Sequence, residues 1–306
     1  MPDSSHPSVL WLDGEIVPWE RATMHITDAP AFAHSIFEGI RAYWNPAQER
    51  SYIFRLDAHL TRFIHSMKLM RMSTTLSKEQ IAHGAVEVCR VNGYREDIYV
   101  RPLAYFDPGF QLSSATGPAH VLINTWPRAS QLDRPTGLKC CVSSWTRIAD
   151  NILPARIKCY ANYRNSALAW TEAALNGYDS TILLNTRGKV SEGPGACLMF
   201  IRDGAVITPT VTSDILESVT RLTLLQVCRD VLGIETVERE VDRTELYTAD
   251  EVFFCGTGAE VNPVASIDGY TIGDGGIGPI TQQLRRLYND LIRGNETRYE
   301  AWRTAV

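Results

Sequence analysis

The chain has 306 residues, of which 44% are hydrophobic and 21% are charged. This composition is that of an ordinary globular protein with a sizeable core. A net charge of −5 gives no electrostatic reason to expect nucleic acid.

No apolar run approaches membrane-spanning length, and the N-terminus lacks the basic start and apolar core of a signal peptide. The seven cysteines are scattered and form no CxxC pair. This usage is typical of free thiols in a reducing compartment, so we expect a cytoplasmic protein that has no membrane partner.

The first third of the chain alternates strand and helix patterns. Residues 8–18 predict a hairpin around Asp13-Gly14. Asp57 is expected to cap a helix with an apolar face of Leu60, Phe63, Ile64 and Met67. The other elements expected here are a helix at 77–91 and strands at 51–55, 97–106 and 119–126.

Residues 127–137 carry two prolines and no periodicity, which predicts a connection between a small N-terminal domain (1–126) and a large C-terminal domain (138–306). The elements expected after it are strands at 138–145, 180–185, 196–201 and 251–255, and helices at 162–176, 218–232 and 279–292. Strands and helices mixed without a strict βαβ rhythm favour an α+β fold.

Two segments could bind a phosphate group. Residues 217–221 open an expected helix and offer backbone amides together with the Ser218 and Thr220 hydroxyls. Residues 255–259 form a turn after a strand, where Gly256 and Gly258 let the backbone approach a ligand. For either segment alone, an ordinary helix cap or turn is the commoner explanation.

Several single residues could carry chemistry. Tyr99 and Arg101 alternate on an expected strand, so they share one face that suits a carboxylate or a structural ion pair. Arg62 could reach a phosphate or simply lie on the surface. Lys158 could form a Schiff base, and Glu192 could pair with a protonated pyridine nitrogen. No histidine pair has the spacing of metal ligands, so no metal is expected.

Taken together, these segments resemble the branched-chain aminotransferase family of fold type IV, class IV pyridoxal-phosphate enzymes. The resemblance runs from about Ile36 to the C-terminal helix. The segments that carry it are Phe37-Glu38-Gly39-Ile40-Arg41, Tyr99-Val100-Arg101-Pro102-Leu103, Ser143-Ser144-Trp145, Lys158 with Asn162-Tyr163, Ser191-Glu192-Gly193, Ser218-Val219-Thr220-Arg221 and Gly256-Thr257.

The resemblance implies two α/β domains with the site of pyridoxal 5′-phosphate between them, and a homodimer. It implies that Lys158 is the Schiff-base lysine, that Glu192 pairs with the ring nitrogen and that Tyr163 donates to the ring 3-oxygen. The phosphate-binding positions that it implies are Arg62, Ser218, Val219, Thr220, Gly256 and Thr257. The substrate-binding positions are Phe37, Tyr99, Arg101, Thr257 and Gly258, with Arg101 taking the side-chain carboxylate of glutamate.

Three departures from the family pattern leave the preferred keto acid open. Phe32 stands where a pocket tyrosine is usual, the 127–135 connection is short, and Ala196-Cys197 replaces Glu-Asn. The expected activity is transfer of an amino group between L-glutamate and a hydrophobic 2-oxo acid. The alternatives are a D-amino-acid or (R)-amine transaminase, an aminodeoxychorismate lyase on the same fold, and a binding protein without catalysis.

Overall fold

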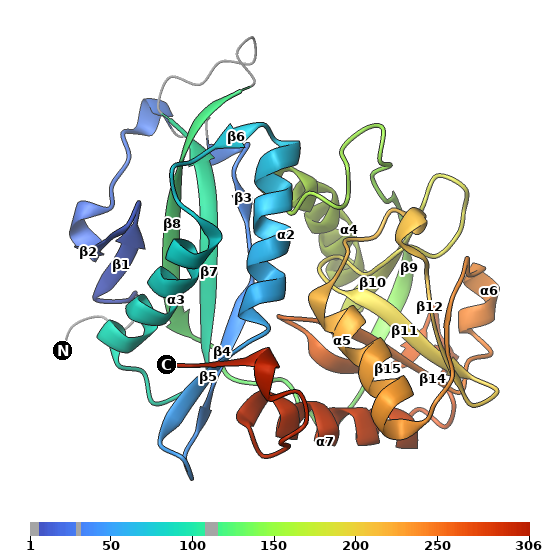
Figure 1. Cartoon of the computed structure of the whole chain (residues 1–306). Coiled ribbons are helices and arrows are strands. Elements are labelled where there is room, and N and C mark those ends of the chain that lie inside the picture. Colours follow the sequence, from blue (N-terminus) through green and yellow to red (C-terminus); the bar gives the residue numbers. More distant parts are fainter. Residues whose placement is uncertain (1–5, 29–31, 108–115) are drawn as a thin grey trace. The chain divides into compact units, whose positions relative to one another are not determined.

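In a computed structural model of the chain, residues 6–28, 32–107 and 116–306 are described (Figure 1). They form two compact units. Unit 1 comprises Met1–Ala129, Ile157–Ala161 and Asp290–Val306, and unit 2 comprises Ser130–Arg156 and Asn162–Asn289. The segment that carries Lys158 therefore belongs to unit 1, although the chain on both sides of it belongs to unit 2. The domain limits expected at residues 126 and 138 stay a prediction.

Unit 1 is built on a sheet that, in the described part of the chain, has nine strands. Their order is β17-β5-β4-β7-β8-β1-β2, with β3 beside β7 and β6 beside β8. The pairs are antiparallel except β6 with β8. The strands are β1 (Val9–Leu12), β2 (Glu15–Pro18), β3 (Ile36–Phe37), β4 (Ile40–Asn45), β5 (Arg50–Phe54), β6 (Met72–Ser73), β7 (Ile98–Phe106), β8 (Gly117–Pro127) and β17 (Arg303–Ala305).

The hairpin expected at 8–18 is confirmed as β1 and β2. Asp13 and Gly14 connect these strands with φ angles of 49° and 106°. A two-residue hairpin with positive φ at both turn positions matches the right-handed twist of its strands, and Asp-Gly tolerates these angles.

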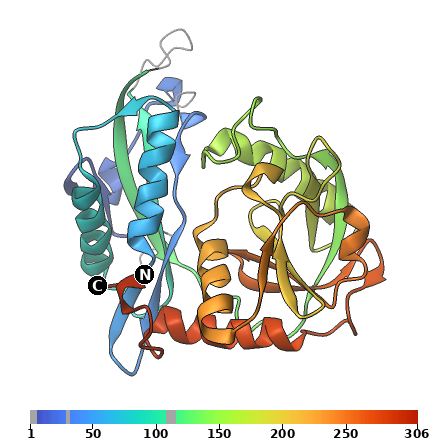
Figure 2. The same ribbon diagram turned by 45° about the vertical axis from the view of Figure 1, so that its right-hand side comes forward.

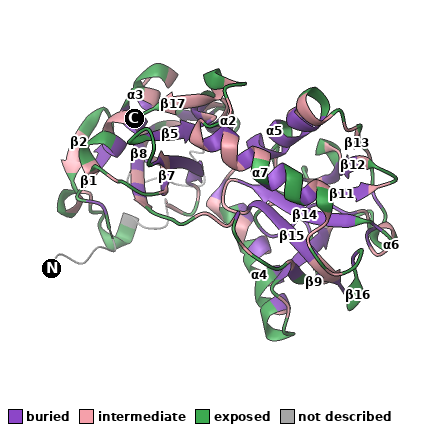
Figure 3. Ribbon diagram, turned by 90° about the horizontal axis from the view of Figure 1, so that it is seen from below, coloured by how far each residue is buried: buried purple, intermediate pink, exposed green. Residues whose placement is uncertain are grey.

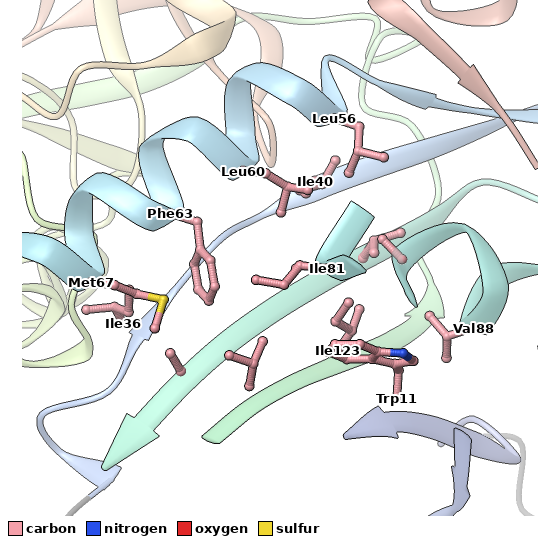
Figure 4. Packing of buried hydrophobic residues seen from close by; sticks show 14 of the residues in the cluster. Trp11, Ile36, Ile40, Leu56, Leu60, Phe63, Met67, Ile81, Val88 and Ile123 are labelled. Atoms are coloured by element: carbon pink, nitrogen blue, oxygen red, sulfur yellow. The ribbon is translucent and has the colours of Figure 1, made fainter. Parts of the chain in front are cut away.

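Two helices, α2 (Leu56–Leu69) and α3 (Lys78–Asn92), lie on one face of this sheet (Figure 2). From α2, Leu60, Phe63 and Met67 are buried, at helical spacing, in a cluster with residues of α3 and of the sheet. Figure 4 shows these three side chains pointing toward the strands. The apolar face expected for this helix is thus the one that covers the sheet, except that Ile64 is only half-buried.

The expected cap at Asp57 is wrong. The helix begins at Leu56, its N-cap is Arg55 in the left-handed conformation (φ 57°), and no side chain caps it. Asp57 lies inside the first turn and instead pairs with Lys78 of α3, at 2.6 Å. The hydrophobic period located the helix, but the backbone conformation at Arg55 moved its start toward the N-terminus.

Unit 2 holds a second sheet, eight-stranded within the described residues, in the order β10-β9-β15-β14-β11-β12-β13 with β16 beside β15. Strands β11, β14 and β15 are almost wholly buried (Figure 3). The strands are β9 (Leu138–Thr146), β10 (Ser180–Leu184), β11 (Cys197–Arg202), β12 (Ala205–Thr208), β13 (Thr236–Glu238), β14 (Glu251–Gly256), β15 (Glu260–Ile267) and β16 (Tyr270–Thr271).

The helices of this half of the chain are α4 (Tyr163–Leu175), α5 (Val219–Val227), α6 (Arg243–Leu246) and α7 (Pro279–Arg293). The helix expected at 218–232 ends its α-helical part at Val227, and a π-helical turn continues it to Leu232. The division between the two units falls within α7. Each unit combines helices with a sheet in which most strand pairs are antiparallel. The expected α+β class is therefore confirmed.

Candidate functional site

Lys158 is held in unit 1 by its backbone. Its carbonyl accepts from the Phe37 amide at 2.9 Å, and its amide donates to the Ser66 hydroxyl of α2 at 3.4 Å. Its neighbour Cys159 forms an isolated bridge with Ile36 of β3. The Lys158 Nζ lies 4.8 Å from the centre of the Phe37 ring. The segment is thus fixed between a strand edge and a helix.

A break between β3 and β4 brings Glu38 into the interior. Both strands pair with β7, but Glu38 and Gly39 leave the ladder, and the Glu38 amide donates to the carbonyl of Pro102. A Cβ on Gly39 would lie 1.9 Å from the Tyr99 hydroxyl. Only glycine therefore lets the Tyr99 side chain occupy its place.

Glu38 is fully buried and organises two residues of α2. It accepts from Arg62 Nε and Nη2, each at 2.7 Å, and lies 2.8 Å from His59 Nδ1. Burial by itself would raise the pKa of Glu38, but the Arg62 charge and the bonds from Arg62 and His59 lower it to about 2. Burial lowers the pKa of His59 against the pull of Glu38, so His59 is neutral near pH 7 and donates Nδ1–H to the carboxylate. Arg62, expected at the cofactor phosphate, is thus aimed by a buried carboxylate.

The expected substrate residues of unit 1 come together around one cation. The Arg101 guanidinium carbon lies 5.0 Å from the ring centre of Phe37, 5.2 Å from Tyr99, 5.0 Å from Trp126 and 6.0 Å from Tyr160. Its Nη1 donates to the Tyr160 hydroxyl at 2.9 Å. Its Nε is buried and has no partner among the described residues. No carboxylate of the described residues pairs with it, so the structural ion pair weighed as an alternative is not formed.

In unit 2, Glu192 is buried with a donor on each carboxylate oxygen. Arg147 Nη2 lies 2.8 Å from Oε1, and the Leu216 amide donates to Oε2 at 3.1 Å. Arg147 is itself buried, and its Nε donates to the Asp214 carbonyl at 3.3 Å. Two donors from separate parts of the chain thus hold the Glu192 carboxylate in one orientation.

Cys197 contacts Glu192. Its Sγ lies 3.7 Å from Glu192 Oε2 and 3.4 Å from the Leu216 carbonyl, so the thiol can donate to either. Cys197 stands where the family pattern has an asparagine. The structure shows that a weak donor remains, although a thiol bonds less strongly than an amide.

The two phosphate-binding candidates lie near this carboxylate. Leu216, which donates to Glu192, stands two residues before Ser218, the N-cap of α5. The Ser218 hydroxyl accepts from the Arg221 amide at 3.2 Å, whereas the Val219 and Thr220 amides open the helix, where N–H groups have no acceptor within the helix. Gly256 ends β14, and a Cβ on it would only touch Ala196 and Gly195 at 3.5 and 3.6 Å. Packing therefore does not by itself require glycine at this position.

Thr257 and Gly258 are half-buried in the turn between β14 and β15, and Tyr163 is the first residue of α4. The preceding Asn162 is buried and donates to the Pro154 carbonyl at 3.0 Å, which fixes the start of that helix. Arg221 is buried and tied to Pro209 and Glu238, so it is a structural residue.

Sequence reasoning missed residues that act through the expected ones: Glu38, His59, Trp126, Arg147, Tyr160. The signals were close at hand, since Glu38 follows Phe37, Arg147 follows the Ser-Ser-Trp segment, and Tyr160 stands two residues after Lys158. Each is a polar or aromatic residue beside a recognised position, but only the contacts show that it faces that position.

In the part of the chain that the structure describes, no group of three or more His, Cys, Asp or Glu residues could hold a metal ion. No described helix combines the length and the apolar character needed to cross a membrane.

The chain is similar to known proteins over most of its length. The pattern of the family described as Amino-transferase class IV matches residues 35–267. A probable branched-chain-amino-acid aminotransferase of Aquifex aeolicus is 42% identical over 97% of this chain and 96% of its own length.

Two solved structures have the same fold. The branched-chain amino acid aminotransferase of Thermobaculum terrenum in its PLP form superposes with a TM-score of 0.96 at 47% identity, covering 98% of this chain and 99% of that one. The branched-chain aminotransferase of Thermoproteus uzoniensis with norvaline does so with a TM-score of 0.92 at 37% identity, covering 98% and 99%. The chain therefore belongs to the branched-chain aminotransferase family, within the class IV aminotransferases.

Proposed function

We propose that the protein is a pyridoxal-phosphate-dependent transaminase. It moves an amino group between L-glutamate or 2-oxoglutarate and a branched-chain or related hydrophobic L-amino acid or its 2-oxo acid. The observation that carries the proposal is that Lys158 Nζ and the Arg101 guanidinium both lie over the Phe37 ring, at 4.8 and 5.0 Å. A reactive amine and a carboxylate-binding cation thus share one apolar neighbour.

The residues present suit the cofactor. When bound, pyridoxal 5′-phosphate supplies an aldehyde carbon and a ring that accepts electrons from the substrate Cα. Lys158 would hold it covalently, and Glu192, held in place by Arg147 and the Leu216 amide, would pair with its ring nitrogen. Tyr163 would donate to the ring 3-oxygen.

For the phosphate we propose Arg62 together with hydroxyls and backbone amides. Arg62 is oriented by Glu38, and helix openings such as that of α5 bind anions through unpaired amides. The hydroxyls and amides are the Ser218 and Thr220 hydroxyls, the amides of Val219 and Thr220, and the backbone at Gly256 and Thr257.

The substrate residues work in two ways. Tyr99 and the amides of Thr257 and Gly258 would orient the α-carboxylate, which places Cα within reach of Lys158. The Lys158 amine would then take the proton from Cα and return it during the transfer. Phe37 offers the apolar surface for a hydrophobic side chain, and Arg101 would bind the second carboxylate of glutamate through its buried, unpartnered Nε.

Borohydride reduction followed by peptide mapping tests the proposal. We expect the purified protein to be yellow, the reduced cofactor to be attached to Lys158, and the absorbance to shift on addition of L-glutamate. Attachment elsewhere would remove Lys158 from its role. A shift with D-alanine or an (R)-amine but not with L-glutamate would instead support the alternative transaminases.

We also propose that the enzyme acts as a homodimer in the cytoplasm. The seven cysteines are all buried free thiols, which suits a reducing compartment. Light scattering of the purified protein tests the oligomeric state, and a mass of one chain would contradict it.

A further inference from the structure

The proposed activity requires that the charge of Arg101 be compensated with two different kinds of substrate bound. Two kinds of side chain must enter one pocket in turn, and only one of them carries a negative charge. A buried cation without a partner is costly. While an apolar side chain occupies the pocket, some group of the protein must therefore compensate the Arg101 guanidinium.

Tyr160 is placed to do this. Its hydroxyl accepts from Arg101 Nη1 at 2.9 Å, and its ring packs 4.4 Å from that of Phe37. The Tyr160 amide donates to the Ser35 carbonyl at 3.0 Å, so the backbone beneath the ring is anchored to unit 1. A phenol suits this place because it can accept from a cation without adding a negative charge that would repel a substrate carboxylate.

Other rings near Arg101 cannot take this part. Phe37 and Trp126 have no acceptor oxygen, and the Tyr99 hydroxyl is aimed at the space left by Gly39. Phe32, at the position where the family pattern has a tyrosine, lacks a hydroxyl and packs against Tyr105 with ring centres 5.5 Å apart.

We infer that Tyr160 is a positioning residue that sets the dual specificity of this pocket, an inference that rests on the proposed function. Its hydroxyl holds the Arg101 guanidinium in place, with Nε left to receive the second carboxylate of glutamate or 2-oxoglutarate. When the side chain is apolar, the hydroxyl and the surrounding rings compensate the cation, and Arg101 does not have to leave the pocket.

The test is Tyr160→Phe, which keeps the ring and removes only the hydroxyl. Two unreactive acids probe the holoenzyme by calorimetry, namely glutarate for the dicarboxylate and 4-methylpentanoate for the hydrophobic substrate. We expect the Kd of 4-methylpentanoate to rise roughly 10- to 100-fold, because the Arg101 guanidinium is then buried beside an apolar side chain without its acceptor. The Kd of glutarate should change less than about threefold, because its second carboxylate itself supplies a partner for the cation. In steady-state kinetics, KM for L-leucine should rise while KM for L-glutamate stays.

The matched control is Tyr105→Phe on the same strand as Arg101, where the ring packs beside His120 at 5.2 Å. Both Kd values should then match the wild type. Equal weakening of both acids in Tyr160→Phe, or no change in either, would overturn the inference. If the wild-type enzyme does not exchange amino groups between L-glutamate and L-leucine, the proposed function fails first. If the wild-type enzyme does exchange them, the results for Tyr160→Phe test only the role of Tyr160.

Discussion

At the scale of single residues, the buried charges of this chain are held by partners far away in sequence. Glu38 holds Arg62 and His59 from another element, and Arg147 holds Glu192. A charge buried alone is unfavourable, and removing one partner of a buried pair leaves the other uncompensated. The expected site residues are thus oriented by residues to which the sequence alone assigned no role.

We predict that Glu38 contributes to stability in a pH-dependent way. Its pKa falls from an ordinary 4.5 to about 2 on folding, so folding favours the deprotonated form. This contribution, about 3 kcal/mol, is complete above pH 4.5 and is lost as the pH falls toward 2. Glu38→Gln should be less stable by about 3–5 kcal/mol near pH 7, and the difference from the wild type should shrink between pH 4.5 and 3. Urea unfolding at several pH values measures this.

The control is Asp57→Asn, which removes an exposed carboxylate from the first turn of the same helix. Its pair with Lys78 is solvated, so the change should cost less than about 1 kcal/mol at every pH. A Glu38→Gln deficit that stayed constant with pH would contradict the low pKa assigned to Glu38.

At the scale of elements, two helix N-termini have similar caps but different roles: one only stabilises its helix, and the other also belongs to the proposed cofactor site. Ser77 caps α3 in a reciprocal capping box with Gln80, accepting at 3.2 Å and donating at 2.8 Å. Ser218 caps α5 with the same 3.2 Å contact to the third residue of the helix. The two caps are alike in geometry, but only α5 begins next to the residue that donates to Glu192.

We predict that replacing either cap by alanine costs about 1 kcal/mol of unfolding free energy. Only Ser218→Ala should also weaken pyridoxal-phosphate binding, by roughly tenfold, because a donor to an anion is lost. Urea unfolding of the apo-protein measures the first effect, and equilibrium titration with the cofactor measures the second. Equal cofactor affinities in the two variants would show that Ser218 caps the helix but does not bind the cofactor.

At the scale of the whole molecule, the seven cysteines behave as core residues. Burial raises the pKa of Cys89, Cys228 and Cys255 to about 12 each and also raises the pKa of Cys140. At pH 8 a thiol of pKa 12 is ionised in only about one molecule in 10,000, and the thiolate is the reactive form.

We therefore predict that a disulfide reagent such as Ellman's reagent modifies the native protein slowly at pH 8. Seven equivalents should react once denaturant is added. The time course of colour release measures both. A rapid release of one equivalent or more from native protein would show a reactive thiol that burial does not protect.

Much of the fold follows from local patterns. Asp13-Gly14 marked the hairpin, and the apolar period of residues 60–67 marked α2, because turn geometry and amphipathicity are properties of adjacent residues. Strands β4 and β15 were not predicted. Strand β4 shows little alternation of buried and exposed residues, since five of its six residues are buried. Strand β15 follows the turn at residues 255–259, whose glycines we interpreted as a candidate phosphate-binding turn.

The candidate site divides in the same way. Residue types and their order were enough to single out Lys158, Glu192, Tyr99 and Arg101, because each has a chemistry that few other side chains can supply. Their partners Glu38, Arg147 and Tyr160 emerged only with the chain folded. A hydrogen bond depends on direction and distance between segments that lie far apart along the chain, and no local pattern in a single sequence records that.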